Sequence, residues 1–178
     1  MRHLTINRRE FLLLTGSALG GALLAPQVFA QLAPGVASGL VESNLVYLTP
    51  LRSDGSESAC QAELWFVADG AGVYVVTAHD AWRARAVTRG LTQARVWVGD
   101  VGVWTRSNGT YRALPQMEAE AAFVTDPVEH ARLLEIFGAK YSMVWLIWRS
   151  RFRNGLADGS RVMLRYQPIS SAGASSGR

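Results

Sequence analysis

Short strand-forming runs separated by glycine-containing turns are the feature that most constrains how this chain can fold. The run at 59–67 alternates between apolar and mostly polar residues, which is the period of a strand with one buried face. Asp54-Gly55 precedes it and Asp69-Gly70 follows it, and both dipeptides favour tight turns between antiparallel strands. With the β-rich runs at 45–49 and 72–77, this part of the chain predicts three strands in an antiparallel meander.

The rest of the chain adds strands and two or three short helices. We expect strands at 94–98, 117–124 and 161–166, and a hairpin turn at 107–109. Six or seven strands with few helices predict a mainly β (α+β) fold. An antiparallel barrel with peripheral helices is the natural architecture, because closure hides the sheet edges.

The expected helices have recognisable starts. Asp80 is expected to cap a short helix that ends before Gly90. Asp126 is expected to cap another, with Pro127 in its first turn and Glu129 at the capping-box position. Residues 141–148 fit a further helix, with a strand as the alternative.

Composition excludes several classes of protein. With 178 residues, of which 49% are hydrophobic, the chain can build one domain around a core without a covalent staple. Cys60 is the only cysteine, so an intramolecular disulfide and a multi-thiolate metal site are excluded, and we interpret it as a packed thiol. The sequence contains no glycine-rich phosphate loop, Ser-His-Asp order or zinc spacing. Hydrolases and nucleotide-hydrolysing enzymes therefore have no support.

The first thirty residues have the layout of an export signal. Asn7-Arg8-Arg9-Glu10-Phe11-Leu12 precedes an apolar run, and this order closely resembles the twin-arginine signal. We expect cleavage after Ala30, which makes the twin-arginine export machinery a partner and the protein periplasmic or otherwise exported. The apolar run is interrupted by glycines and Pro26, so we expect no membrane span after cleavage.

Loss of residues 1–30 removes three arginines and one glutamate, so the formal net charge falls from +4 to +2. A nucleic-acid partner is not expected at this charge. Residues 31–43 and 170–178 are rich in small and polar residues, which predicts a flexible N-terminal segment and a disordered tail. The folded domain is expected at 44–169.

The order of several short motifs carries a family resemblance. Along the chain come Tyr47-Leu48-Thr49, Glu63-Leu64-Trp65-Phe66, Val73-Tyr74-Val75-Val76-Thr77, Asp80-Ala81-Trp82-Arg83 and Phe137-Gly138-Ala139-Lys140-Tyr141. In this order the chain resembles the flavin-binding split β-barrels, the fold of pyridoxamine-phosphate-oxidase-like proteins and deazaflavin-dependent reductases. The resemblance covers about residues 44–168. It implies a homodimer that binds FMN or, in the same groove, a deazaflavin coenzyme.

The resemblance also implies where the cofactor phosphate binds. In that family the strand that ends in Thr77 and the helix start after it hold the phosphate through a Ser and a Lys two residues apart. This chain has Ala81 and Arg83 at those positions. Arginine keeps the positive charge and offers a planar pair of donors to phosphate, whereas Ala81 supplies no hydroxyl. From the residues alone, the same corner is an anion site or a solvated basic helix.

We therefore predict seven cofactor-binding residues. Thr77, Arg83 and Arg85 are expected to hold the phosphate and ribityl chain, Trp82 and Trp65 to line the ring site, and His79 and Ala81 to lie beside them. His79 and His130 are isolated histidines, and we interpret them as surface or cap residues rather than haem or metal ligands.

Two further groups have structural interpretations. The six tryptophans are expected mostly in the core or a dimer interface. The arginines at 149, 151 and 153 either reach a cofactor phosphate across that interface or form a solvated loop, and we favour the loop.

Together these features predict an exported FMN-binding oxidoreductase that acts on a small molecule. A flavin supplies its own reacting atom, so no obligate protein acid or base is required. The alternatives are a deazaflavin-dependent reductase of the same fold and a non-catalytic exported barrel that binds a ligand or partner.

Overall fold

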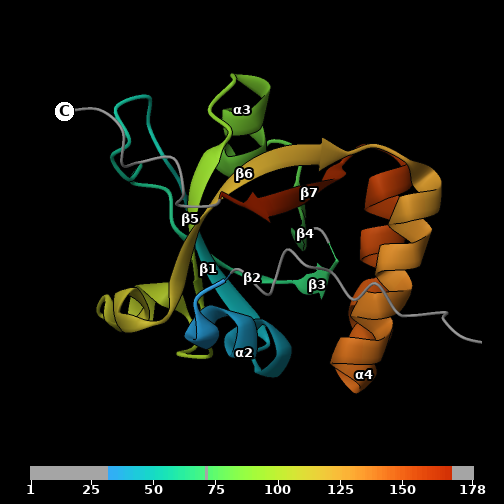
Figure 1. Cartoon of the computed structure of the whole chain (residues 1–178). Coiled ribbons are helices and arrows are strands. Elements are labelled where there is room, and N and C mark those ends of the chain that lie inside the picture. Colours follow the sequence, from blue (N-terminus) through green and yellow to red (C-terminus); the bar gives the residue numbers. More distant parts are fainter. Residues whose placement is uncertain (1–31, 71, 170–178) are drawn as a thin grey trace, which may run out of the picture.

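Seven antiparallel strands form one sheet in the computed structural model, which describes residues 32–70 and 72–169 (Figure 1). Their order is β2-β1-β5-β6-β7-β4-β3. Their bounds are Leu45–Pro50 (β1), Ala62–Trp65 (β2), Val67–Asp69 (β3), Gly72–Ala78 (β4), Gln93–Val98 (β5), Gln116–Val124 (β6) and Arg161–Pro168 (β7). The predicted signal at 1–30 and the tail at 170–178 lie outside the described residues.

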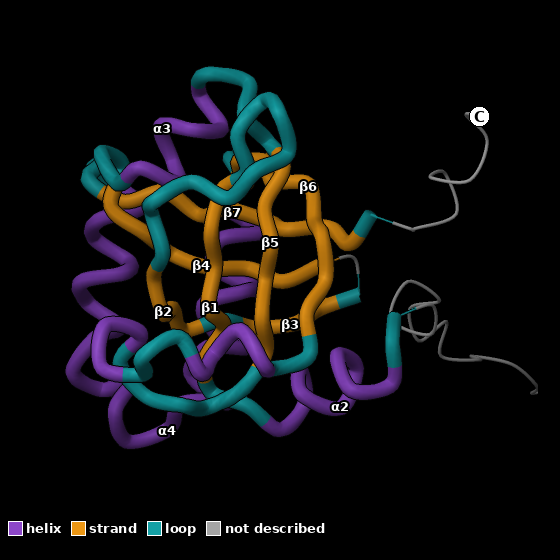
Figure 2. Tube along the Cα trace, turned by 90° about the vertical axis from the view of Figure 1, so that its left-hand side faces the viewer, coloured by secondary structure: helices purple, strands orange, loops and turns teal. Residues whose placement is uncertain are grey.

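The sheet closes on itself at Phe66. This single residue separates β2 from β3, which lie at opposite ends of the strand order. The sheet therefore curls into a nearly closed barrel (Figure 2). The predicted antiparallel split β-barrel is confirmed.

The predicted strand at 59–67 was wrong in its bounds. Two short strands replace it: Leu48 of β1 pairs with Ala62 of β2, whereas β3 pairs with β4. At the break, the Tyr141 hydroxyl accepts a hydrogen bond from the backbone N–H of Phe66 at 2.8 Å and lies 2.8 Å from the Phe66 carbonyl oxygen. Tyr141 thus takes the place of a neighbouring strand for Phe66.

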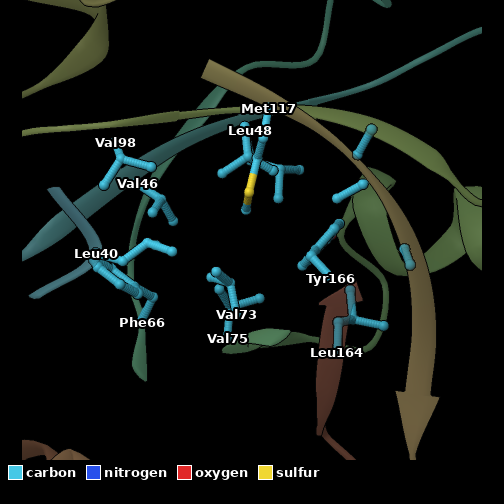
Figure 3. Packing of buried hydrophobic residues seen from close by; sticks show 14 of the residues in the cluster. Leu40, Val46, Leu48, Phe66, Val73, Val75, Val98, Met117, Leu164 and Tyr166 are labelled. Carbon is cyan, nitrogen blue, oxygen red and sulfur yellow. The ribbon is translucent and has the colours of Figure 1, made fainter. Parts of the chain in front are cut away.

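Two apolar clusters lie on opposite sides of the sheet. Alternate residues of β4 divide between them, with Val73 and Val75 inside the barrel and Tyr74 and Val76 outside. Figure 3 shows the interior cluster, into which both valines point. The outer cluster is covered by α4, Pro127–Ala157.

Helix α4 is a hairpin of two helical arms. Ser142 has φ 42° and ψ −109°, which is not helical. The rings of Phe137 and Phe152 are 5.9 Å apart, although in a straight helix fifteen residues would span about 22 Å. The chain therefore reverses at Ser142, as the two side-by-side arms in Figure 1 show. The predicted helix at 141–148 is confirmed for 143–148, which lie in the second arm, but the reversal at Ser142 separates them from Tyr141, and α4 is longer than the short helices we expected.

The start of α4 confirms Asp126 as the cap, because its carboxylate accepts a hydrogen bond from Val128 N–H at 2.9 Å. Glu129 does not complete a capping box and instead pairs with Arg132 at 2.8 Å.

Three local predictions were wrong. The short helix after β4 is α3, Trp82–Thr88, and its N-cap is Ala81, with no hydrogen bond from a capping side chain such as Asp80. Residues 107–109 form no hairpin turn, because they join two 3-10 helices, η1 (Trp104–Arg106) and η2 (Thr110–Ala113).

The third error concerns the segment 31–43, which is not flexible at 34–42. Helix α2, Pro34–Glu42, buries Val36 and Leu40 in the barrel cluster. A β-carbon at Gly39 would lie 3.0 Å from a Val98 methyl, so the glycine allows α2 to pack closely on β5.

None of the helices in the described part of the chain is both long enough and apolar enough to span a membrane.

Candidate functional site

Thr77 and Arg83 form the centre of the predicted site. Thr77 lies at the end of β4 and is 3% exposed, and Arg83 is half-buried on α3. The Arg83 guanidinium donates a hydrogen bond to the Thr77 hydroxyl oxygen. Thr77 shares the barrel-interior side of β4 with Val73 and Val75, because alternate residues of a strand face the same way. The guanidinium is therefore held against the end of the barrel interior.

The electrostatics of Tyr166 support this position. Tyr166 of β7 is almost fully buried, and this burial raises the pKa of its hydroxyl. The positive charge of Arg83 opposes that rise, whereas the Cys60 thiol adds to it. Arg83 therefore acts electrostatically on the inner face of the barrel.

Two arginines lie over the Trp82 ring: Arg85 of α3 and Arg89, the residue that caps the C-terminus of α3. The guanidinium carbon of Arg85 is 5.5 Å from the indole centroid and that of Arg89 is 5.3 Å from it. Both distances suit cation–π attraction. Within residues 32–70 and 72–169, the ion pairs involve Arg95, Arg112 and Arg132 and none of the arginines of α3. Helix α3 and its C-cap thus carry three arginines, Arg83, Arg85 and Arg89, that form no ion pair with a described carboxylate.

His79 and Ala81 lie between Thr77 and α3. The His79 side chain is exposed, and its Nδ1 is 3.3 Å from the carbonyl oxygen of Ser160. Ala81 supplies only backbone groups: its carbonyl accepts hydrogen bonds from the N–H of Ala84 and of Arg85 at 3.0 Å. Six of the seven predicted residues are therefore grouped around the β4–α3 connection.

The seventh residue, Trp65, belongs to a different part of the molecule. Its ring stacks on Tyr141 of α4 at 4.6 Å and meets Trp148 edge-on at 6.1 Å. Trp65 is therefore packed in the cluster outside the barrel, whereas Thr77 lies on the inner side of the sheet. The structure does not bring Trp65 to Arg83.

The other candidates behave as ordinary structural residues. Cys60 is half-buried, and its backbone N–H donates to the Ser58 hydroxyl at 3.3 Å. His130 Nε2 lies 2.7 Å from the Val124 carbonyl oxygen. Among the described residues, no group of three or more His, Cys, Asp or Glu side chains could hold a metal ion.

Lys140 is a distinctive residue that the sequence reasoning missed. Its amine lies 3.3 Å from the centroid of the Phe66 ring and is half-buried. Burial lowers the pKa of Lys140 to about 8, although Asp100 acts in the opposite direction. The available signal was that Lys140 is the only lysine in a chain with many arginines.

No protein-family model and no curated protein matches this sequence. Solved structures match its fold. The haem storage protein HutZ from Vibrio cholerae is 18% identical, with a TM-score of 0.53 over 78% of this chain and 90% of that chain. ChuZ from Campylobacter jejuni is 9% identical, with a TM-score of 0.51 over 75% of this chain and 51% of that chain.

A conserved hypothetical protein from Mycobacterium tuberculosis is 15% identical, with a TM-score of 0.51 over 75% of this chain and 78% of that chain. At sequence identities this low, the likeness to these structures establishes a shared fold and nothing more. Its strand order, its near-closure and its likeness to these solved structures show that the chain has an antiparallel split β-barrel fold.

Proposed function

We propose that this protein is an exported, homodimeric flavoprotein that binds FMN and oxidises or reduces a small molecule. The observation that carries the proposal is the half-buried Arg83 guanidinium, fixed by the Thr77 hydroxyl and unpaired with any described carboxylate. An unneutralised, positioned guanidinium suits a phosphate group, because its planar donors match two phosphate oxygens.

The residues around Arg83 fit the chemistry of FMN. Arg83 and Arg85 supply positive charge for the phosphate, and the Thr77 hydroxyl is a further polar group for the ribityl chain. Trp82, beside Arg85, provides an aromatic surface for the ring. When bound, the flavin would supply the hydride-transferring atom, and the protein would supply position and electrostatics. Trp65 has no place in this arrangement, because it packs on α4.

A deazaflavin coenzyme remains the alternative within the same fold. Its phosphate would use the same arginines, so the described residues do not discriminate between the two rings.

Haem is a second candidate, and His79 is the observation that favours it. Histidines that bind metal commonly donate their other ring N–H to a backbone carbonyl, and Nδ1 of His79 is 3.3 Å from the Ser160 carbonyl oxygen. The exposed Nε2 would be the ligating atom, and the arginines of α3 would meet the haem carboxylates. The likeness to a haem storage protein supports testing this ligand.

The absorption spectrum of the purified full-length chain, alone and after addition of each ligand, separates these candidates. We expect the protein to take up FMN and show a bound flavin spectrum. A Soret band that is lost in His79→Ala would favour haem instead. Binding of none of flavin, deazaflavin and haem would contradict the proposal and favour the alternative of a non-catalytic barrel.

The role of Arg83 is tested by Arg83→Ala with two matched ligands. We expect FMN binding to weaken by about 10- to 100-fold, because a hydrogen bond to a charged group contributes roughly 1.5–3 kcal/mol. Riboflavin, which lacks the phosphate, should bind almost unchanged. Arg106→Ala removes an exposed arginine elsewhere and is the control. Equal losses for FMN and riboflavin would reject Arg83 as the phosphate ligand.

A further inference from the structure

Four large apolar side chains are exposed to solvent just after the turn of the α4 hairpin. Met143 is 78% exposed, Val144 45%, Leu146 61% and Ile147 77%, and we call these four residues the hairpin tip. Isolated exposed apolar residues are normal on a protein surface, but a contiguous group marks an interaction site.

The hairpin tip is held on a packed base. Trp145 points inward, stacks on Phe137 at 5.9 Å and meets Phe152 edge-on at 5.6 Å. One helical turn further along, Trp148 meets the Trp65 ring edge-on at 6.1 Å. These aromatic contacts fix the inner side of the second arm, so its outer side presents the apolar residues in a defined position.

The helical hairpin carries charge of one sign on its own residues beside the hairpin tip, and Asp100 of another segment acts electrostatically on Lys140 and Tyr141 at its base. Residues 136–157 contain no Asp or Glu. Arg149, Arg151 and Arg153 are exposed, and none of them pairs with a carboxylate in the described part of the chain. Arg151 lies over the Trp148 ring at 5.2 Å. The occupant that this surface suits is therefore apolar and negatively charged.

The spacing of apolar and charged residues matches a lipid interface. With a rise of about 1.5 Å per residue, Arg149, Arg151 and Arg153 lie about 6, 9 and 12 Å along the arm from the middle of the hairpin tip. Interfacial segments bury apolar side chains about 5–10 Å into the boundary between headgroups and acyl chains. The arginines would then lie at the level of the lipid phosphates.

We propose that the hairpin tip docks on the surface of an anionic lipid bilayer, with the arginines at 149, 151 and 153 contacting the headgroup phosphates. A second copy of the chain is a poorer occupant. Contact through the same face would bring the arginines of both copies into one interface, where residues 136–157 offer no carboxylate to pair with them. The proposal concerns a surface contact and is independent of the cofactor.

Co-sedimentation of the full chain with vesicles tests the proposal. We expect binding to vesicles of phosphatidylglycerol and phosphatidylcholine and much weaker binding to phosphatidylcholine alone. The double variant L146S/I147S should lose most of the binding to the anionic vesicles. The double variant R149Q/R153Q should weaken it by about fivefold per arginine. Residues 1–30 are present in every variant, so a difference between variants reports on the hairpin tip and its arginines.

Two controls keep the test specific. Val128→Ser removes an apolar side chain that is 76% exposed near the start of α4, and Arg106→Gln removes an exposed arginine outside α4. Both should bind vesicles like the unmodified chain, and circular dichroism should show that all variants are folded. Equal vesicle binding by L146S/I147S and the unmodified chain would overturn the proposal. A change in oligomeric state without a change in vesicle binding would instead assign the hairpin tip to contact between copies.

Discussion

The position of Lys140 makes the stability of the protein depend on pH. Its amine is half-buried over the Phe66 ring, and burial lowers its pKa from 10.5 to about 8. Between these two pH values the unfolded chain holds a proton that the folded chain has released. The contribution of Lys140 to the free energy of unfolding therefore rises with pH between about 8 and 10.5. Below pH 8 the amine is charged in both the folded and the unfolded state, so folding carries the full free-energy cost of burying the charge.

We expect Lys140→Met to be more stable than the unmodified chain at pH 7 and to lose this advantage as the pH approaches 10.5. Methionine fills a similar volume without a charge to bury. Urea unfolding at pH 7 and pH 10 measures both effects, and Arg52→Met, at an exposed arginine, is the control. A Lys140 resonance that titrates near 10.5 in the folded protein would contradict the expectation, and the single lysine makes that NMR measurement unambiguous.

At the same scale, the sequence alone predicted the part of the site whose residues are close together along the chain. Thr77, Ala81 and Arg83 come together because the end of β4 leads directly into α3. Trp65 was misplaced because its partner, Tyr141, lies far away in the sequence. Lys140 was missed because burial of one side of α4 depends on where Phe66 lies in the closed barrel.

At the scale of elements, the two arms of α4 reverse direction at Ser142. Its φ of 42° is unfavourable for a residue with a β-carbon, and such conformations cost about 1–3 kcal/mol. Glycine adopts positive φ readily. We expect Ser142→Gly to raise the free energy of unfolding by about 1 kcal/mol and Ser142→Val to lower it, both measured by urea unfolding.

Ser150 provides a control in the second arm, where the backbone is helical. Ser150→Gly should lower the free energy of unfolding by about 0.5 kcal/mol, because glycine disfavours a helix. Two glycine substitutions in one helix should therefore act in opposite directions. If Ser142→Gly destabilised the protein as Ser150→Gly does, residues 141–143 would be helical and the hairpin would be wrong.

Most strands were predictable because their signals are local. Alternation and glycine turns placed β1, β4, β5, β6 and β7 to within a few residues. The break at Phe66 was not predictable, because the Tyr141 hydroxyl that replaces its strand partner comes from 75 residues further along. Helix α2 was missed because Pro34, Gly35, Ser38 and Gly39 resemble a loop, and its stability comes from burial rather than from helix propensity.

At the scale of the whole molecule, the sheet separates an inner cluster from an outer one, and each cluster needs a helix to complete it. Helix α4 covers the outer cluster. Helix α2 completes the inner cluster with Val36 and Leu40. Figure 3 shows Leu40 beside Val46 and Val98 of the barrel. The barrel domain therefore begins before β1, at about residue 34, and α2 is part of its core.

This boundary is tested by two neighbouring residues of α2. Leu40 is 4% exposed, whereas Val41 is 83% exposed. We expect Leu40→Ala to lower the free energy of unfolding by about 2–4 kcal/mol, because it removes buried methyl groups and leaves a cavity at the end of the barrel. Val41→Ala should change it by less than about 0.5 kcal/mol. Urea unfolding followed by tryptophan fluorescence measures both. If residues 34–42 were a flexible segment, the two variants would be equally stable, and the domain would begin at β1 after all.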